Sequence, residues 1–286
     1  MVEKKNVPEI RFEGFVNEWE SKEMQELFEI GNGKDYKHLN TGEYPVYGSG
    51  GYMVSVNEYL HDGESVCIGR KGTIDNPLFL TGKFWTVDTL FFTHSFKECL
   101  PYFTYCAFKK IKWRNYNEAG GVPSLSKANI QKIKTWIPST TEQQKIGNFF
   151  RHLDGLIAHQ ELKFKKVTQL KAAMLDKMFP KEGSKIPEIR FKGFEGEWEE
   201  KKVIEVCAIS TGKSNTQDKN DKGDYPFYVR SPIIERSTKF LYNEEAVLTV
   251  GDGVGTGKVF HYVKGKYDLH QRVYRMFNFQ DILGMD

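Results

Sequence analysis

The sequence VPEIRFEGFVNEWE spans Val7–Glu20, and a close copy of it, IPEIRFKGFEGEWE, spans Ile186–Glu199. Units of solenoid repeats are about 20–50 residues long, so two copies this far apart do not indicate a solenoid. They indicate two domains that begin in the same way and then diverge. The length of 286 residues suits about two domains of roughly 150 residues each.

Shorter matches follow each copy in the same order. GEYPVYG, which begins at Gly42, returns as GDYPFYV at Gly223, and GKFW returns later as GKYD. The loops between these matches differ, with GRKGT at Gly69–Thr73 and GDGVGTGK at Gly251–Lys258. A shared scaffold with different loops is typical of two binding modules that recognise different targets. The chain reaches Asp286 before any counterpart of GGVPSLSKAN, so we expect an incomplete second domain with unpaired strand edges.

Short alternating runs after the first copy predict strands and tight turns. These runs, at residues 43–54, 64–75 and 77–92, are rich in β-branched and aromatic residues and are separated by Gly, Asn and Asp. A helix is expected at Pro101–Lys112. The sequence GGVPSLSKANIQKIKTWIP then predicts a loop, a short helix capped near Ser126, and a strand.

A long helix is predicted from Glu142 to Phe179. Thr141 and Gln144 have the spacing of a capping box, whose side chains satisfy free N–H groups at a helix start, and Pro180 cannot continue a helix. The helix would be roughly 57 Å long, which favours a rod over a core helix of a globular domain. Residues spaced four and three apart along it are apolar except for Gln160 and Lys171, as in a coiled-coil seam that packs against another helix. This helix seam consists of Ile146, Phe150, Leu153, Ile157, Phe164, Val167, Met174 and Met178.

These elements divide the chain into three segments. The first domain is expected at residues 1–140, the spacer helix at 141–180, and the incomplete second domain at 181–286. Each domain should combine a small twisted β-sheet with short helices, and the helix between them is of the coiled-coil type. The fold class is therefore α+β.

The composition is that of an ordinary soluble protein, with 39% apolar and 28% charged residues. No apolar run approaches the roughly 18 residues of a membrane span, and the polar Met1–Asn6 does not begin a signal peptide. The four cysteines lack C-x-x-C spacing, and no histidines pair at metal-binding spacing. We therefore expect a cytoplasmic protein without a metal site.

Known catalytic motifs are not matched. STGKS at Ser210–Ser214 lacks the preceding glycine of a phosphate-binding loop, because Cys207 occupies that position. The glycines of Gly251–Lys258 lie between two runs that resemble strands, so they do not form a dinucleotide site; they form either a phosphate contact or a flexible hairpin turn. Basic residues from Phe108 to Lys134, interleaved with aromatics, suit a nucleic-acid backbone, although a solvated face would have the same composition.

Three stretches carry a resemblance to one family: GRKGTID…GKFWTVDTLFF, GGVPSLSKANIQKI and TTEQQKIGNFFRHLDGLI. Together with the two copies of PEIRF.GF..EW, they resemble the DNA-specificity (S) subunit of type I restriction–modification enzymes. The resemblance covers essentially the whole chain. Members of that family normally complete the second domain and add a second long helix antiparallel to the first, so by this comparison the chain is C-terminally incomplete.

The resemblance implies a subunit that performs no chemistry itself. Each domain would recognise one half of a split double-stranded DNA sequence, and the helix would set the gap between the halves. Modification subunits would methylate adenine with S-adenosylmethionine, and a restriction subunit would cut DNA with ATP and Mg²⁺, so no cofactor is expected in this chain. Two chains would also be able to form a homodimer by pairing their long helices antiparallel.

Base recognition in the first domain is expected in the loops Tyr47–Gly51, Gly69–Thr73 and Asn115–Lys127. Arg70 is the strongest candidate, because a guanidinium flanked by glycine can approach guanine with two hydrogen bonds. Contacts to phosphates, which position the protein without specifying sequence, are expected from Lys71, Lys109, Lys110 and Arg114. The expected DNA-contacting residues of this domain are Lys34, Tyr47, Ser49, Arg70, Lys71, Thr73, Lys109, Lys110, Arg114, Asn115, Tyr116, Ser124, Ser126 and Lys127.

In the second domain the corresponding surface is expected at Tyr228–Ser231, Asp252–Lys258 and His270–Arg272. The residues expected to contact DNA there are Arg230, Lys258, His270, Gln271 and Arg272. Two alternatives from other classes remain at this stage: a carbohydrate- or protein-binding adaptor that uses the same aromatic loops, and a nuclease with an unrecognised site. DNA binding with a steep salt dependence would favour the first interpretation over both.

Overall fold

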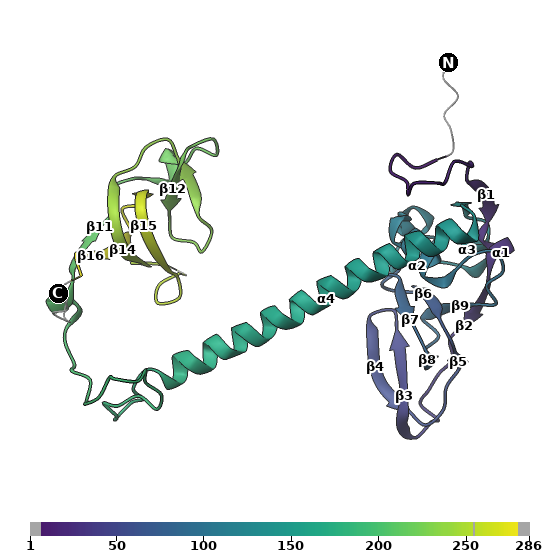
Figure 1. Cartoon of the computed structure of the whole chain (residues 1–286), viewed down its shortest axis with the longest axis horizontal. Coiled ribbons are helices and arrows are strands. Elements are labelled where there is room, and N and C mark those ends of the chain that lie inside the picture. The colour runs from purple at the N-terminus through teal and green to yellow at the C-terminus, as the bar shows by residue number, and fades with distance from the viewer. Residues whose placement is uncertain (1–6, 254, 280–286) are drawn as a thin grey trace, which may run out of the picture. The chain divides into compact units, whose positions relative to one another are not determined.

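The structure, a computed structural model, describes residues 7–253 and 255–279. The chain divides into two compact units, Met1–Leu170 and Lys171–Asp286, each with its own β-structure (Figure 1). The segment Met1–Asn6, to which the expectation about a signal peptide referred, and the chain end at Asp286 lie outside the described residues.

Within residues 7–139, the first unit contains ten strands and three short helices. Its elements are β1 (Glu20–Glu23), α1 (Met24–Leu27), β2 (Glu29–Asn32), β3 (Thr41–Gly48), β4 (Gly51–Val56), β5 (His61–Asp62), β6 (Ser65–Gly69), β7 (Leu78–Leu80), β8 (Lys83–Thr86), β9 (Leu90–His94), α2 (Pro101–Lys110), a 3₁₀ turn (Trp113–Tyr116), α3 (Lys127–Gln131) and β10 (Lys134–Ile137). The predicted strands, α2, and the short helix capped by Ser126 are all confirmed.

These strands form three small sheets around a buried core. Their orders are β1-β10, β2-β9-β6-β7 and β4-β3-β8-β5. The core beneath them includes Phe28, Phe108 and Trp113, with the rings of the last two 5.0 Å apart. Burial of such side chains stabilises this unit.

In the residues that the structure describes, the second unit forms one six-stranded sheet. Its elements are α5 (Val203–Val206), β11 (Ala208–Thr211), a 3₁₀ turn (Thr216–Asp218), β12 (Tyr225–Tyr228), β13 (Glu235–Ser237), β14 (Tyr242–Val250), β15 (Phe260–Leu269) and β16 (Val273–Phe277). The strand order is β11-β16-β14-β15-β12-β13. Leu248, Tyr267 and Leu269 are buried in its core, so this unit too has an apolar core of its own.

The two units repeat one topology. The order β2-β9-β6 in the first corresponds to β11-β16-β14 in the second. A parallel pair also recurs, because β3 pairs with β8 in the first unit as β12 pairs with β15 in the second. Two similar α+β domains connected by a long helix, as the sequence predicts, are confirmed.

The long helix α4 spans Thr140–Lys177. The expected capping box at Thr141 and Gln144 is wrong, because both residues lie inside the helix. Ser139 caps it instead, since its Oγ accepts a hydrogen bond from Glu142 N at 3.4 Å, and the Gln144 amide donates to Asn148 Oδ1. The chain turns directly from β10 through Pro138 into the helix, which places the cap two residues earlier than the sequence pattern suggests.

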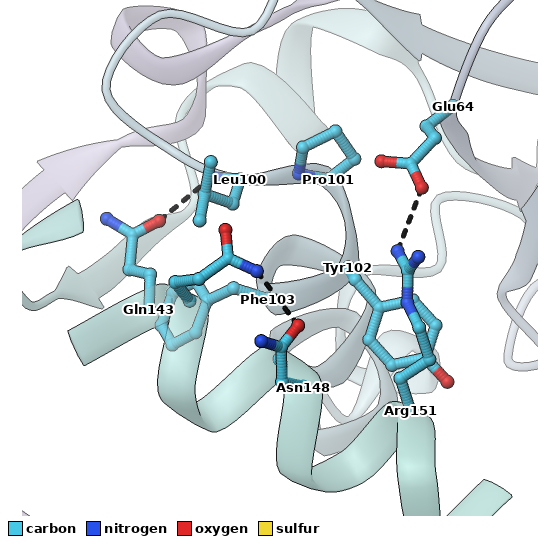
Figure 2. Close-up of a pocket in the computed structure, with 10 residues that line it drawn as sticks. Glu64, Leu100, Pro101, Tyr102, Phe103, Gln143, Asn148 and Arg151 are labelled. Carbon is cyan, nitrogen blue, oxygen red and sulfur yellow. Dashed lines mark hydrogen bonds and ion pairs between the residues drawn. The ribbon is translucent and has the colours of Figure 1, made fainter. Parts of the chain in front are cut away.

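The first turns of α4 are fastened to the first domain. The Gln143 side chain is fully buried and satisfied, because its amide donates to Glu98 O and Pro138 O and its Oε1 accepts from Leu100 N at 2.9 Å. Further along α4, the Arg151 guanidinium pairs with Glu64 at 2.8 Å (Figure 2). Beyond this point the helix seam is open: Ile157 is 56% exposed and Phe164 76% exposed.

Candidate nucleic-acid interface

In the first domain, loops far apart in sequence meet around the turn Val87–Thr89, which we call the central turn. Arg70 N donates to Thr89 O at 2.8 Å, and Val87 N donates to Tyr47 O at 3.0 Å. The Arg70 guanidinium lies against the same turn, 3.5 Å from Asp88 O. Two of the three predicted recognition loops are therefore held by the backbone of one short turn.

The third predicted loop joins them through Gly69–Thr73. Gly72 N donates to Pro123 O, and Leu125 N donates to Arg70 O, both at 2.9 Å. Lys71 and Ser124 also form a β-bridge. The backbones of the three loops predicted from the sequence are thus linked to one another through Gly69–Thr73 and the central turn.

The second domain repeats this arrangement at His270–Arg272, its central turn. His270 N donates to Tyr228 O at 3.0 Å, as Val87 N does to Tyr47 O. Gly251 N donates to Arg272 O at 3.0 Å, as Arg70 N does to Thr89 O. The bond from Lys34 N to Thr86 O in the first domain likewise recurs between Lys213 N and Leu269 O.

Matching backbones present different side chains in the two domains. Arg70 and Lys71 of the first domain correspond to Gly251 and Asp252 of the second. Conversely, the first central turn has Val, Asp and Thr, whereas the second has His, Gln and Arg. In the first domain the positive charge lies on the loop beside the central turn. In the second domain it lies on the central turn itself.

Charged groups surround the second central turn. Asp252 bridges two arginines, at 3.3 Å from Arg230 and 3.0 Å from Arg272. Burial and these two arginines lower the pKa of His270, whose Nδ1 accepts a hydrogen bond from Arg272 N at 3.1 Å. A neutral imidazole therefore helps to shape the turn.

Buried serine hydroxyls and a buried carboxylate form hydrogen bonds next to the second central turn. Asp268 is fully buried and accepts hydrogen bonds from Ser214 Oγ at 2.6 Å and Ser237 Oγ at 2.9 Å. Gln271 N in turn donates to Ser214 O at 2.9 Å. Lys258 closes the glycine-rich loop, with its N–H bonded to Gly255 O; Val254 in that loop lies outside the described residues.

Other predicted residues take structural positions. The Ser126 hydroxyl caps α3 by accepting from Asn129 N and donates to Glu118, so it is not free to contact a ligand. Arg114 forms an ion pair with Asp75 at 2.6 Å, and that contact lowers the pKa of Asp75.

The remaining predicted residues differ in how exposed they are and in whether they contact the three loops. Lys34, Thr73, Asn115, Tyr116 and Lys127 are exposed, while Tyr47, Ser49 and Ser124 are half-buried. Lys109 extends over the Tyr105 ring of its own helix. Within residues 7–253, no hydrogen bond, ion pair or cation–π contact joins Lys109 or Lys110 to the three loops.

Sequence reasoning missed the first central turn. Val87–Thr89 carries no basic or aromatic residue, so its composition gives no sign of a recognition surface. The signal lay in the repeat, because GKFWTVDT aligned with GKYDLHQR places this turn opposite His270–Arg272.

The described residues contain no group of three or more His, Cys, Asp or Glu side chains placed to hold a metal ion. Likewise, none of the helices in the part of the chain that the structure covers has both the length and the apolar character of a bilayer span.

Comparison with protein families gives one match. A model described as the type I restriction modification DNA specificity domain matches residues 17–169 and 195–280, well over half of the chain. A comparison with curated proteins found no match.

One solved structure shows the same fold, and a second is less similar. The S subunit of the type I restriction-modification system from M. genitalium is 13% identical, with a TM-score of 0.69 over 94% of this chain and 75% of that one. The HsdS subunit from Thermoanaerobacter tengcongensis is 11% identical, with a TM-score of 0.40 over 93% of this chain and 76% of that one.

Proposed function

The chain belongs to the type I restriction–modification DNA specificity family, and we propose that each domain recognises one part of a split DNA sequence through the loops around its central turn. The chain is thus a non-catalytic specificity subunit, and membership of this family decides against the adaptor and nuclease alternatives. It would act in the cytoplasm, where its DNA is.

One observation carries this proposal: two central turns with the same backbone hydrogen bonds and different side chains. The backbone hydrogen bonds shared by the two domains hold the recognition side chains at a fixed place. Different side chains at that place would contact different bases. Base contacts specify a sequence, whereas phosphate contacts only position the protein. Two frames with different side chains therefore suit two different half-sites.

We assign base recognition in the first domain to Arg70 and that in the second to Arg272. Each is next to the backbone bonds that fix its loop, and a guanidinium placed against guanine contributes about 1–3 kcal/mol of discrimination. Lys71, Lys109, Lys110 and Lys127 would contact phosphates. The Asp252 carboxylate would orient Arg272 before DNA binds, because it already pairs with it at 3.0 Å.

Partner subunits would supply the chemistry. We propose that modification subunits bind this chain and methylate adenine with S-adenosylmethionine, and that a restriction subunit cuts DNA with ATP and Mg²⁺. A homodimer through α4 is the second assembly that we propose, since the exposed side chains of the helix seam suit an antiparallel partner helix.

The proposal is tested by co-expressing the full chain with its modification subunits and mapping the methylated adenines on a plasmid. We expect one split motif. Arg70→Ala should relax that motif at one base position in one half-site. Lys110→Ala, which removes the same charge away from the three loops, should keep the motif and only weaken binding, with a shallower salt dependence.

Two outcomes would contradict these assignments. Methylation without any sequence motif would count against the function. An unchanged motif in Arg70→Ala together with an altered motif in Lys110→Ala would leave the function standing and overturn the division of roles between the two residues.

A further inference from the structure

A β-bulge in β4 lies beside the first central turn. Val46 of β3 pairs with Val54 of β4. The next residue along β3, Tyr47, pairs with Tyr52, so Met53 is an extra residue between two paired positions. Such a bulge changes the direction of the side chains around it, and bulges are common next to functional sites for that reason.

The bulge brings the Met53 side chain close to the first central turn. Gly48 has no side chain, and a Cβ atom built on it would lie 2.9 Å from Met53 Sδ and 3.4 Å from Val87 Cγ2. The Met53 thioether and the Val87 side chain therefore lie close to the same point beside Gly48. Val87 is buried, whereas Met53 is 46% exposed, so Met53 is the apolar group that a ligand can reach at this point.

A polar recognition group lies beside the same turn. The Arg70 guanidinium is 3.5 Å from Asp88 O, and Met53 lies beside Val87, the residue before Asp88. Base edges in the major groove present hydrogen-bonding atoms, and thymine presents its C5-methyl group as well. A guanidinium suits the hydrogen-bonding atoms, whereas an exposed, flexible thioether suits the methyl group.

We propose that Met53 is a specificity-determining residue that contacts the C5-methyl group of a pyrimidine in the half-site of the first domain. The inference rests on the proposed function, because it needs the loops around the first central turn to lie in the major groove. The contact removes the methyl group and the exposed part of the Met53 side chain from water. It distinguishes bases without a hydrogen bond and so adds to what Arg70 recognises. Thymine carries this methyl group in unmodified DNA, and 5-methylcytosine carries it in DNA methylated at cytosine.

The test uses the full chain assembled with its modification subunits and duplex DNA that carries the mapped motif. Each thymine of the motif, on both strands, is replaced in turn by uracil, which keeps every hydrogen-bonding atom and removes only the C5-methyl group. Kd is measured by competition in fluorescence anisotropy. We expect one replacement to weaken binding of the wild type about fourfold, the effect of one methyl-sized group withdrawn from an apolar contact.

Three variants attribute this sensitivity to Met53. Met53→Gln has a side chain of similar length with a polar amide and should bind the thymine and uracil duplexes equally. Met53→Leu, which keeps an apolar side chain of similar volume, should keep the fourfold difference. Gly48→Ala places a Cβ atom 2.9 Å from Met53 Sδ, so it should displace the thioether and reduce the difference without changing Met53 itself.

A second set of duplexes, with 5-methylcytosine in place of each cytosine, distinguishes the two sources of the methyl group. Tighter binding to one of them, abolished by Met53→Gln, would assign the contact to 5-methylcytosine instead of thymine. Wild-type binding that neither uracil nor 5-methylcytosine changes at any position would overturn the proposal and leave the proposed function standing. A uracil effect of equal size in the wild type and Met53→Gln would overturn the role of Met53. Methylation without any motif would contradict the proposed function and this inference together.

Discussion

Gly69 permits the close turn that positions Arg70. A Cβ atom at this position would lie 1.9 Å from Thr73 O, and that contact involves backbone that cannot rotate away. We expect Gly69→Ala to lower the free energy of unfolding of the first domain by about 1–3 kcal/mol, as measured by urea denaturation. It should also alter recognition in one half-site only.

Gly50→Ala is the matched control for this prediction. It lies in the expected recognition loop Tyr47–Gly51, yet a Cβ atom there meets no heavy atom within 4 Å. Its urea midpoint should equal that of the wild type. Equal stability of Gly69→Ala and Gly50→Ala would mean that the loop does not depend on the close approach of Gly69 to Thr73.

His270 makes the second central turn sensitive to pH. Its pKa is lowered by burial first and then by Arg230 and Arg272, with Asp252 acting in the opposite direction. The unfolded chain, with an ordinary histidine pKa near ~6.5, therefore takes up a proton at a higher pH than the folded domain does. Stability contributed by the neutral ring is present above that pH and is lost as pH falls toward the folded pKa.

Urea denaturation of wild type and His270→Gln at pH 7.5 and pH 5.5 measures this effect, about one unit either side of the unfolded pKa. The wild type should lose more stability between the two pH values than the variant, because its unfolded chain takes up a proton at His270 that the folded domain, with two arginines near the ring, resists. Other titrating groups affect both proteins equally, so the difference isolates His270. An identical pH dependence in the two proteins would rule out this role.

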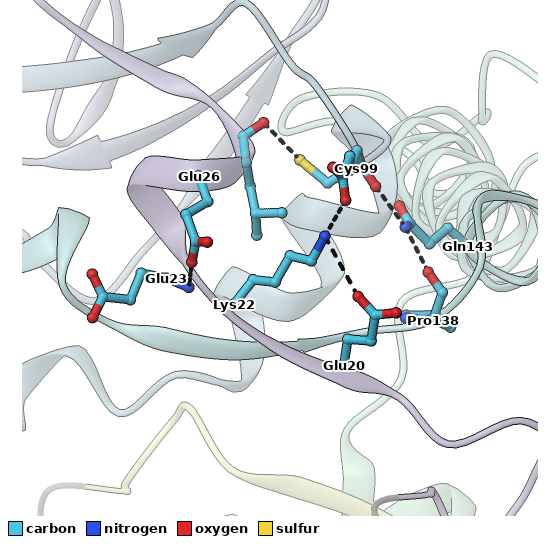
Figure 3. A network of polar contacts seen from close by, with 9 residues as sticks. Glu20, Lys22, Glu23, Glu26, Cys99, Pro138 and Gln143 are labelled. Atoms are coloured by element: carbon cyan, nitrogen blue, oxygen red, sulfur yellow. Dashed lines mark hydrogen bonds and ion pairs between the residues drawn. The ribbon is translucent and has the colours of Figure 1, made fainter.

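At the scale of elements, α4 has a fastened part and an open part. Gln143 (Figure 3) and Arg151 hold its beginning to the first domain, whereas Ile157, Phe164 and Val167 are exposed along one seam. Burying each such side chain contributes about 1.5–3 kcal/mol. We expect the isolated chain to dimerise through this seam at tens of micromolar, and Ile157→Asp with Phe164→Asp to make it monomeric by light scattering.

A control that adds at least as much negative charge lies on another face of the helix. His159→Asp with Lys166→Asp also introduces two aspartates within the same turns, away from the helix seam. That variant should remain dimeric. A wild-type chain that is strictly monomeric at these concentrations would rule out the homodimer. Modification subunits would then be the expected partners of the helix seam.

Local patterns predicted some elements well because local interactions form them. Ser126 caps α3 as its position before the helix suggests, and short apolar runs with β-branched or aromatic residues mark β6 and β9. The start of α4 was misplaced because Ser139, directly after a proline, competes with Thr141 for the cap. The first central turn could not be found locally, since tertiary backbone bonds, not its own side chains, give it its role.

At the scale of the whole molecule, each domain stands on its own core. The first is built around Trp113, Phe108 and Phe28, while the second has a smaller cluster around Tyr267 and Leu248. Separate cores mean that a change in one recognition surface leaves the other intact. That independence is what the repeated opening in the sequence indicated, although the sequence could not show that both central turns use the same bonds.

Separate cores also predict how the chain comes apart. The segment Lys181–Lys185 joins α4 to the repeated segment that begins at Ile186 and is exposed, so brief trypsin treatment should cut there first and leave two folded fragments. The smaller core of the second domain should make its fragment the first to unfold in urea and the first to be digested further, because the free energy of unfolding depends on the apolar area buried. Lys181→Gln with Lys185→Gln should delay the first cut without changing either urea midpoint. Equal resistance of the two fragments to trypsin would show that sheet pairing and the hydrogen bonds of Asp268 compensate in the second domain for the smaller apolar cluster. A first cut inside either sheet would contradict the independence of the two domains.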